Sequence, residues 1–322
     1  MNGVTNKYIQ ELERGRKEIY TKKRLCLIPN CKRTAIMNSH VLQRKKILEK
    51  IVGSSNKFYV LNKQSIFNAA PIAPQKLGYK ESYIFAGFCQ ECDSTFFSEI
   101  ENKPLDLSSD RTKILFAYRT LCLEFRKREI YHEQISYLAK HTKENGPDKL
   151  YYFDLDPSHQ ALLDLAFFKE ELELEIYRNK SRFSHYYLKL PQKKVCFSSA
   201  LSIEDKSNPK SLEYDEYGFI NQKPLVTSFI NYFPYDDDSF FLATFHKDYP
   251  CEWTKNILER LKSSESNKLI SDFITYRVDF WAMSSDIYEP WSSEKKSKFS
   301  QEILDNIDNH SFKINSNFSI WD

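Results

Sequence analysis

The chain has 322 residues, of which 41% are hydrophobic and 28% are charged, and its formal net charge is +3. This composition is typical of folded globular proteins and excludes a collagen-like or disordered chain. No stretch approaches the roughly 18 consecutive apolar residues that a membrane-spanning helix requires, so a protein built on such helices is excluded as well. The length favours two or three folded modules over a single core.

The charge is unevenly distributed along the chain. Residues 1–60 contain 14 Lys and Arg against 4 Asp and Glu, whereas residues 201–322 contain 13 against 21. A basic N-terminal segment favours a polyanionic partner, although a solvated helix face accounts for the same side chains equally well. The segment before residue 21 is polar and lacks the apolar core of a secretory signal, so we expect a reducing, cytoplasmic location and no membrane partner.

In chain order, the first expected element is a charged amphipathic helix over residues 4–22. A tight turn at Pro29-Asn30 follows. The expected order from there is a strand over 35–37, a helical or turn-like segment over 41–49, a strand over 58–61, an irregular loop over 68–79, a strand over 83–88 and a helix over 93–101.

Beyond residue 104 the pattern becomes first helical and then mixed. A helix over 110–143 and a second one from Pro157 carry apolar stripes, which predicts an antiparallel helical pair. Strands are expected over 183–190, 194–203, 225–233 and 239–246, with a hairpin turn across 234–238. Three helices then follow over 252–263, 267–283 and 288–306, the last with Pro290 as its first residue.

Four of the seven cysteines form two close pairs, Cys26-x4-Cys31 and Cys89-x2-Cys92. In a reducing compartment such pairs are typical of metal ligands rather than disulfides. One pair on a tight turn and another at a helix start indicate a tetrahedral structural Zn²⁺ with four thiolates, at Zn–S distances of about 2.3 Å. The other three are predicted to be buried structural thiols: Cys122, Cys196 and Cys251.

Residues 26–101 resemble the HNH endonuclease family and its treble-clef zinc relatives. In that family a cysteine pair precedes a strand that ends in a general-base histidine, and a metal ligand directly follows a second C-x2-C. His40 lies nine positions after Cys31, and Asp93 directly follows Cys92. The resemblance implies that His40 activates water and that Asp93 holds a catalytic Mg²⁺ or Mn²⁺ for phosphodiester hydrolysis. Ser39 departs from the pattern, because the family usually has a metal-binding Asp or His there.

Other interpretations of these residues remain open. His40 could be a zinc ligand or could cap the cysteine turn, and Asp93 could be a helix N-cap. Eight cations flank the cysteine pairs and predict a nucleic-acid-binding face, for DNA more than RNA. They are Lys22, Lys23, Arg24, Lys32, Arg33, Arg44, Lys45 and Lys46.

We therefore predict an α+β protein with three domains. They are a basic, zinc-binding, treble-clef-like module over residues 1–104, a helical hairpin over 105–181 and a mixed α/β domain over 182–322. The predicted function is a metal-dependent HNH-like nuclease, and the alternative is a non-catalytic zinc-stabilised module that binds nucleic acid or protein. A small zinc nuclease joined to a larger domain resembles the layout of bacterial phage-defence effectors, in which the C-terminal region would bind a partner protein or a second copy of the chain.

Overall fold

The structure is a computed structural model that describes residues 3–52, 56–61, 73–80, 82–145, 152–202, 224–309 and 318–321. Its helices are α1 (Gly3–Thr21), α2 (Glu49–Ile51), α3 (Gln90–Thr95), α4 (Ser98–Glu101), α5 (Asp110–Asn145), α6 (Tyr152–Arg178), α7 (Glu252–Leu261), α8 (Ser266–Asp272), α9 (Ser285–Tyr288) and α10 (Ser293–Asn309), with wider π-helical turns η1 (Arg44–Leu48) and η2 (Phe273–Arg277). Among these residues, no helix combines the length and the apolar character needed to span a bilayer.

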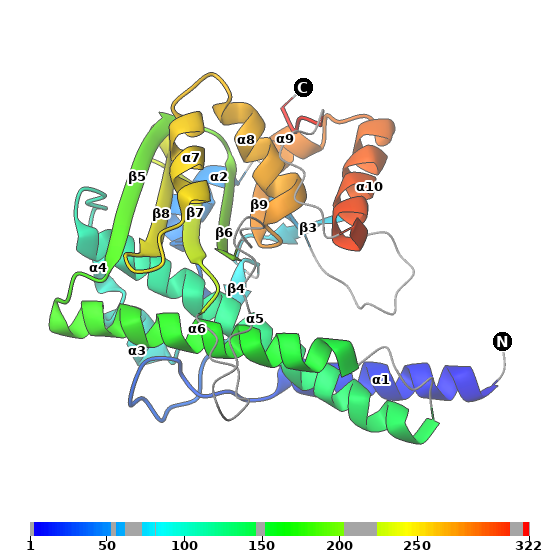
Figure 1. Cartoon of the computed structure of the whole chain (residues 1–322). Coiled ribbons are helices and arrows are strands. Elements are labelled where there is room, and N and C mark those ends of the chain that lie inside the picture. Colours follow the sequence, from blue (N-terminus) through cyan, green and yellow to red (C-terminus); the bar gives the residue numbers. More distant parts are fainter. Residues whose placement is uncertain are drawn as a thin grey trace.

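An antiparallel sheet of seven strands forms the centre of the molecule, in the order β3-β2-β9-β6-β7-β8-β5 (Figure 1). Its strands are β2 (Lys57–Leu61), β3 (Pro74–Gly78), β5 (Phe183–Pro191), β6 (Val195–Ser202), β7 (Thr227–Tyr235), β8 (Asp238–His246) and β9 (Trp281–Ser284). The predicted hairpin is confirmed, because β7 pairs with β8 up to Tyr235 and Asp238. One sheet therefore contains strands from the predicted first and third domains.

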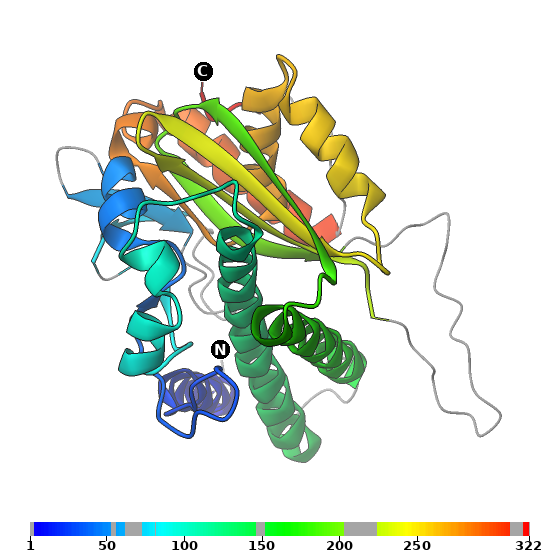
Figure 2. The same ribbon diagram turned by 90° about the vertical axis from the view of Figure 1, so that its left-hand side faces the viewer.

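Helices cover both faces of the sheet (Figure 2). Alternate residues of β7 point to opposite faces, as the two-residue period of a strand requires. Ile230 and Tyr232 pack in the core beneath α7, α8 and α10, whereas Phe229 and Phe233 pack in the core that includes α5. Because every residue of β7 is buried, the strand is apolar along most of its length rather than alternating with polar residues.

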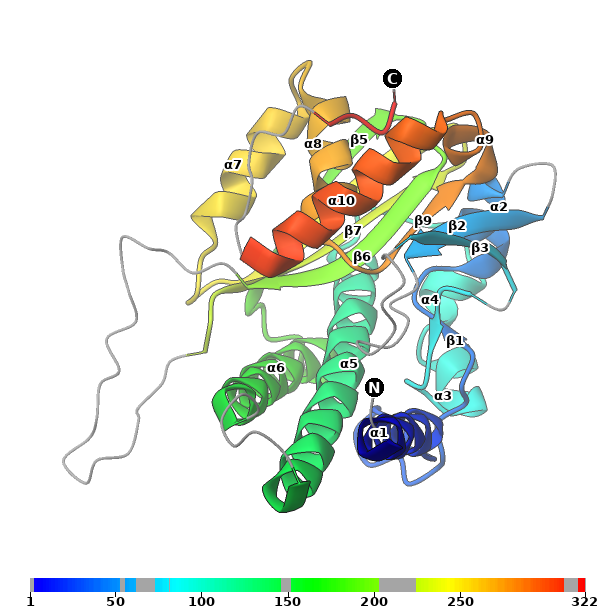
Figure 3. The same cartoon turned by 90° about the vertical axis from the view of Figure 1, so that its right-hand side faces the viewer.

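Helices α5 and α6 form the predicted antiparallel pair on one face of the sheet (Figure 3). Near one end, the Nη1 group of Arg111 donates to the carbonyl oxygen of Ile176, 2.9 Å away. Further along α5, the Nδ1 atom of His132 lies 2.8 Å from the hydroxyl of Ser158. Residue numbers rise along one helix as they fall along the other, which is the antiparallel arrangement.

Several sequence-based expectations were wrong, and non-local packing explains the first two of those that follow. Residues 281–284 are a strand instead of helix, because they fill the gap between β2 and β6 in the sheet. Pro74 begins a strand, which a proline tolerates because β3 lies at the sheet edge. Helix α10 begins at Ser293 rather than Pro290, with the Ser292 hydroxyl accepting from the Lys295 N–H at 3.1 Å.

The segment that contains the cysteine pairs lies beside α5, at one end of the sheet (Figure 3). The expected strand over 35–37 is instead irregular, and the regular structure there is a separate two-stranded ribbon of β1 (Ser39–His40) and β4 (Ile84–Phe85). The irregular loop expected over 68–79 lies outside the described residues up to position 72. The mixed helix and strand content agrees with the predicted fold class.

Candidate metal centre and its surroundings

The first cysteine pair lies on a tight hairpin. The Cys26 N–H donates to the carbonyl oxygen of Arg33 at 2.9 Å, and the Cys31 N–H donates to that of Ile28 at 3.2 Å. Asn30 has a φ of 62°, a left-handed conformation that asparagine tolerates better than most residues. The predicted turn at Pro29-Asn30 thus folds back and brings the two thiols onto one side.

The second cysteine pair lies at the start of helix α3. Cys89 is the N-cap residue, and its sulfur accepts a hydrogen bond from the Cys92 N–H at 3.4 Å. The first turn of a helix has main-chain N–H groups without helical partners, and these stabilise a thiolate. This pair therefore supplies two sulfurs from one short stretch of chain.

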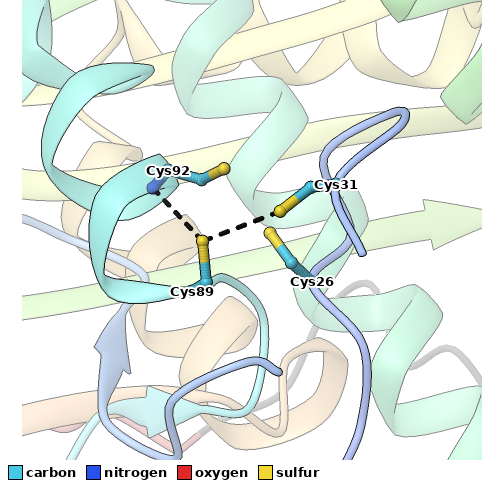
Figure 4. Close-up of side chains that lie close together, drawn as sticks. All are labelled: Cys26, Cys31, Cys89 and Cys92. Carbon is cyan, nitrogen blue, oxygen red and sulfur yellow. Dashed lines mark hydrogen bonds between the residues drawn. The ribbon is translucent and has the colours of Figure 1, made fainter. Parts of the chain in front are cut away.

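The four sulfur atoms converge on one point (Figure 4). All four Sγ atoms lie within 4.8 Å of one another, and those of Cys31 and Cys89 are 3.7 Å apart. A tetrahedral zinc with bonds of about 2.3 Å separates its sulfurs by about 3.8 Å, so this geometry fits such a metal. A hydrogen bond from the Arg33 main chain lowers the pKa of the Cys31 thiol to about 7. A metal ion such as zinc could therefore be held here by four thiolates.

The other three cysteines lie apart from this group, as predicted. Cys122, Cys196 and Cys251 are each buried. Burial raises the pKa of the Cys122 thiol to about 12, so that thiol is protonated at neutral pH. These side chains therefore act as small apolar groups in the core.

His40 lies on strand β1 and is not part of the four-cysteine group. Its Nε2 atom is enclosed and has no hydrogen-bond partner within the described ranges. Burial lowers the pKa of the imidazole to about 4, and the positive charges of Arg44 and Arg119 add to the effect. The ring is therefore neutral at physiological pH, as a general base must be before it accepts a proton.

The neighbouring Ser39 has a structural role. Its hydroxyl accepts from the Phe88 N–H at 3.3 Å and also lies 3.4 Å from the Phe88 carbonyl oxygen. These bonds connect strand β1 to Phe88, the residue directly before the second cysteine pair. Ser39 therefore helps to hold the segment before the second cysteine pair in place.

Asp93 forms an ion pair with Arg119 of helix α5. The Nη2 group of Arg119 lies 2.9 Å from the Asp93 carboxylate, and its Nη1 group contacts the carboxylate of Glu101. Burial raises the pKa of Asp93, and the adjacent guanidinium partly opposes that rise. Asp93 is not the N-cap of α3, because Cys89 occupies that position.

Four of the eight predicted phosphate-binding cations have partners within the protein. Arg24 is buried and pairs with Glu129 and Glu133, so it is a structural residue rather than part of an exposed face. Several others have protein partners: Lys22 with Glu133, Arg33 with Glu91, and Lys46 with the carbonyl oxygen of Lys103. Lys23, Lys32 and Lys45 are exposed, and Arg44 is half-buried.

Helix α5 supplies contacts that the sequence analysis missed. Arg126 donates from Nη2 to the Leu25 carbonyl oxygen at 2.7 Å and from Nε to that of Ala86 at 2.8 Å. The Tyr118 hydroxyl donates to the Leu27 carbonyl oxygen at 3.3 Å. The sequence contained a signal for these contacts. Arg119 and Arg126 are seven residues apart beside the apolar stripe of a long helix, and that spacing places them on one face.

Comparison with protein-family models, curated proteins and solved structures finds no match to this chain. Function must therefore be inferred from the site itself.

Proposed function

We propose that residues 22–101 form a zinc-stabilised module of the treble-clef type that binds nucleic acid. A cysteine hairpin, the β1–β4 ribbon and a helix with the second cysteine pair follow one another in the order of that fold. Four thiolates fill all four positions of a tetrahedral zinc, so the metal has a structural role and no open position for a substrate.

The observation that carries the binding proposal is the location of three exposed lysines that have no ion-pair partner among the described residues. Lys23 and Lys32 are exposed on the two sides of the cysteine hairpin, and Lys45 is exposed after strand β1. All three belong to the segment in which basic residues most exceed acidic ones. Exposed lysines on a rigid zinc module neutralise phosphates and release counterions, which favours a polyanion such as DNA.

Hydrolysis of the bound nucleic acid is a second candidate function. The feature that favours it is His40 on the first strand of the ribbon, a neutral imidazole whose Nε2 atom has no hydrogen-bond partner in the part of the chain that the structure describes. The catalytic Mg²⁺ or Mn²⁺ of the HNH family does not fit this arrangement. Arg119 forms an ion pair with the Asp93 carboxylate that would have to bind the metal. Within the described part of the chain, the four cysteines are the only group of three or more side chains spaced as metal ligands.

Binding is tested with a fluorescein-labelled DNA duplex and full-length protein, at several salt concentrations. Replacing Lys23, Lys32 and Lys45 by alanine should weaken binding and reduce the slope of log Kd against log salt by up to about 0.9 per lysine. The control replaces three lysines of the opposite layer, the half-buried Lys255 and the exposed Lys262 and Lys298. If the variant without Lys23, Lys32 and Lys45 binds DNA as tightly as the wild type, these lysines do not form the DNA-binding face.

Hydrolysis is tested by incubation of the same protein with supercoiled plasmid and Mg²⁺ or Mn²⁺. Nicking that disappears in His40→Gln, with zinc content unchanged, would establish the second candidate. Binding without nicking under all of these conditions would leave the module as a binding unit.

A further inference from the structure

One guanidinium group joins two carboxylates from two different helices. Arg119 of α5 contacts Asp93 of α3 through Nη2 and Glu101 of α4 through Nη1. Its side chain is only 1% exposed, and its Cζ atom lies 4.2 Å from the centre of the Phe97 ring. The arginine is therefore fixed in place on three sides.

We propose that Arg119 is a built-in counter-cation that occupies the space between Asp93 and Glu101 and excludes a divalent metal ion from it. The inference rests on the proposed zinc module and deepens it. It states that the Asp93–Glu101 pair beside the four cysteines holds an arginine and no divalent ion. It depends on the arrangement of α3, α4 and α5 and is independent of whether the module binds DNA.

The groups around Arg119 include donors of the kind that bind a divalent cation. Asp93 and Glu101 are the hard oxygen donors that Mg²⁺ and Mn²⁺ prefer. The Gln43 side-chain amide donates to the main-chain oxygen of Glu101, while its own Oε1 atom is buried without a partner in the described structure. The enclosed Nε2 atom of His40 is a second polar atom near Arg119 that has no hydrogen-bond partner among the described residues.

Arginine has two advantages over a metal ion here. Its planar fork can bind two carboxylates at once, and it always carries a charge. It is also attached to the scaffold, so it does not depend on the concentration of free metal. Removing it would leave two neighbouring carboxylates without a counter-charge, and that arrangement attracts a divalent cation.

The experiment measures Mn²⁺ binding to zinc-loaded, full-length protein by electron paramagnetic resonance. The wild type should leave Mn²⁺ free at concentrations where Arg119→Ala binds about one Mn²⁺ per chain, at least about tenfold more tightly than the wild type. The gain should be lost in the double variant Arg119→Ala with Asp93→Asn. The matched control is Arg128→Ala, an exposed arginine on the same helix, which should behave as the wild type.

Two results would overturn the proposal. One is Mn²⁺ binding to the wild type that Asp93→Asn abolishes, because the site would then already accept a metal. The other is a folded, zinc-loaded Arg119→Ala protein that gains no Mn²⁺ affinity. If Arg119→Ala loses its zinc, Arg119→Gln takes its place, and the wild-type measurement remains decisive. DNA binding is measured in a separate assay. A protein that does not bind DNA would therefore leave the Mn²⁺ result unchanged.

Discussion

Arg126 donates a hydrogen bond from Nη2 to the carbonyl oxygen of Leu25, the residue directly before the first cysteine. The same guanidinium donates from Nε to Ala86, which lies shortly before the second cysteine pair. One side chain of helix α5 thus fixes both segments that carry the sulfur atoms. The position of the metal centre depends on this helix as much as on the cysteine spacing.

Replacing Arg126 by methionine should therefore destabilise the protein and weaken metal retention. The carbonyl oxygens of Leu25 and Ala86 would lose a charged donor, and the expected cost is about 3 kcal/mol in the free energy of unfolding. Urea denaturation measures this loss, and the rate of zinc transfer to a chromogenic chelator measures retention. Arg128→Met, on the exposed side of the same helix, should change neither quantity.

Replacing Cys89 by serine should remove the metal. A hydroxyl is a poor zinc ligand beside three thiolates, so zinc content should fall from about one per chain to near zero. The change should also lower Tm, because metal binding supplies part of the folding free energy. Mass-spectrometric metal analysis and calorimetry give the two readouts. Cys122→Ala is the control, since that thiol is buried away from the group and should leave the zinc content unchanged.

The low pKa of the His40 imidazole leads us to expect that the protein loses stability as the pH falls. The folded protein holds the pKa of this imidazole at about 4, against an ordinary value of 6.5. The unfolded chain therefore binds the proton more readily. This contribution to stability is complete above pH 6.5 and is lost as the pH falls towards 4, by at most about 3 kcal/mol.

The variant His40→Gln isolates this effect. Comparing wild type and variant in the same buffers between pH 4 and 7 cancels the effect of acid on the zinc thiolates. The wild type should lose more stability than the variant across that window. A constant difference would show that His40 is accessible and titrates normally. His159→Gln, at an exposed position of α6, is the matched control.

Helix α1 packs closely against α5 at Gly15. A Cβ atom at this position would lie 2.3 Å from the Tyr137 ring, well inside van der Waals contact. Gly15→Ala should destabilise the protein by about 1 kcal/mol, because a steric cost of about 2 kcal/mol exceeds the roughly 1 kcal/mol gain in helix propensity. In a Tyr137→Ala background the sign should reverse, since the space is then open. Thermal unfolding of the wild type, the two single variants and the double variant gives the complete cycle.

Local features of the sequence were sufficient for much of this protein. The spacing of Cys26, Cys31, Cys89 and Cys92 predicted the convergence of four sulfurs, because a turn and a helix start restrict where each pair can point. The long helices α5 and α6 and the β7–β8 hairpin were also predicted, because periodicity and turn residues act over a few neighbouring positions.

Only the tertiary structure determined how the predicted site residues are used. Residues 281–283 were expected to end a helix but belong to strand β9, because burial between β2 and β6 outweighs local preference. Asp93 directly follows a cysteine pair, as a metal ligand would, yet Arg119 from a helix well beyond it in the chain neutralises its charge. The cysteine spacing determined where a metal could bind, and the packing of α5 determined that the neighbouring carboxylates face an arginine, because a buried charge needs a partner that only the folded chain supplies.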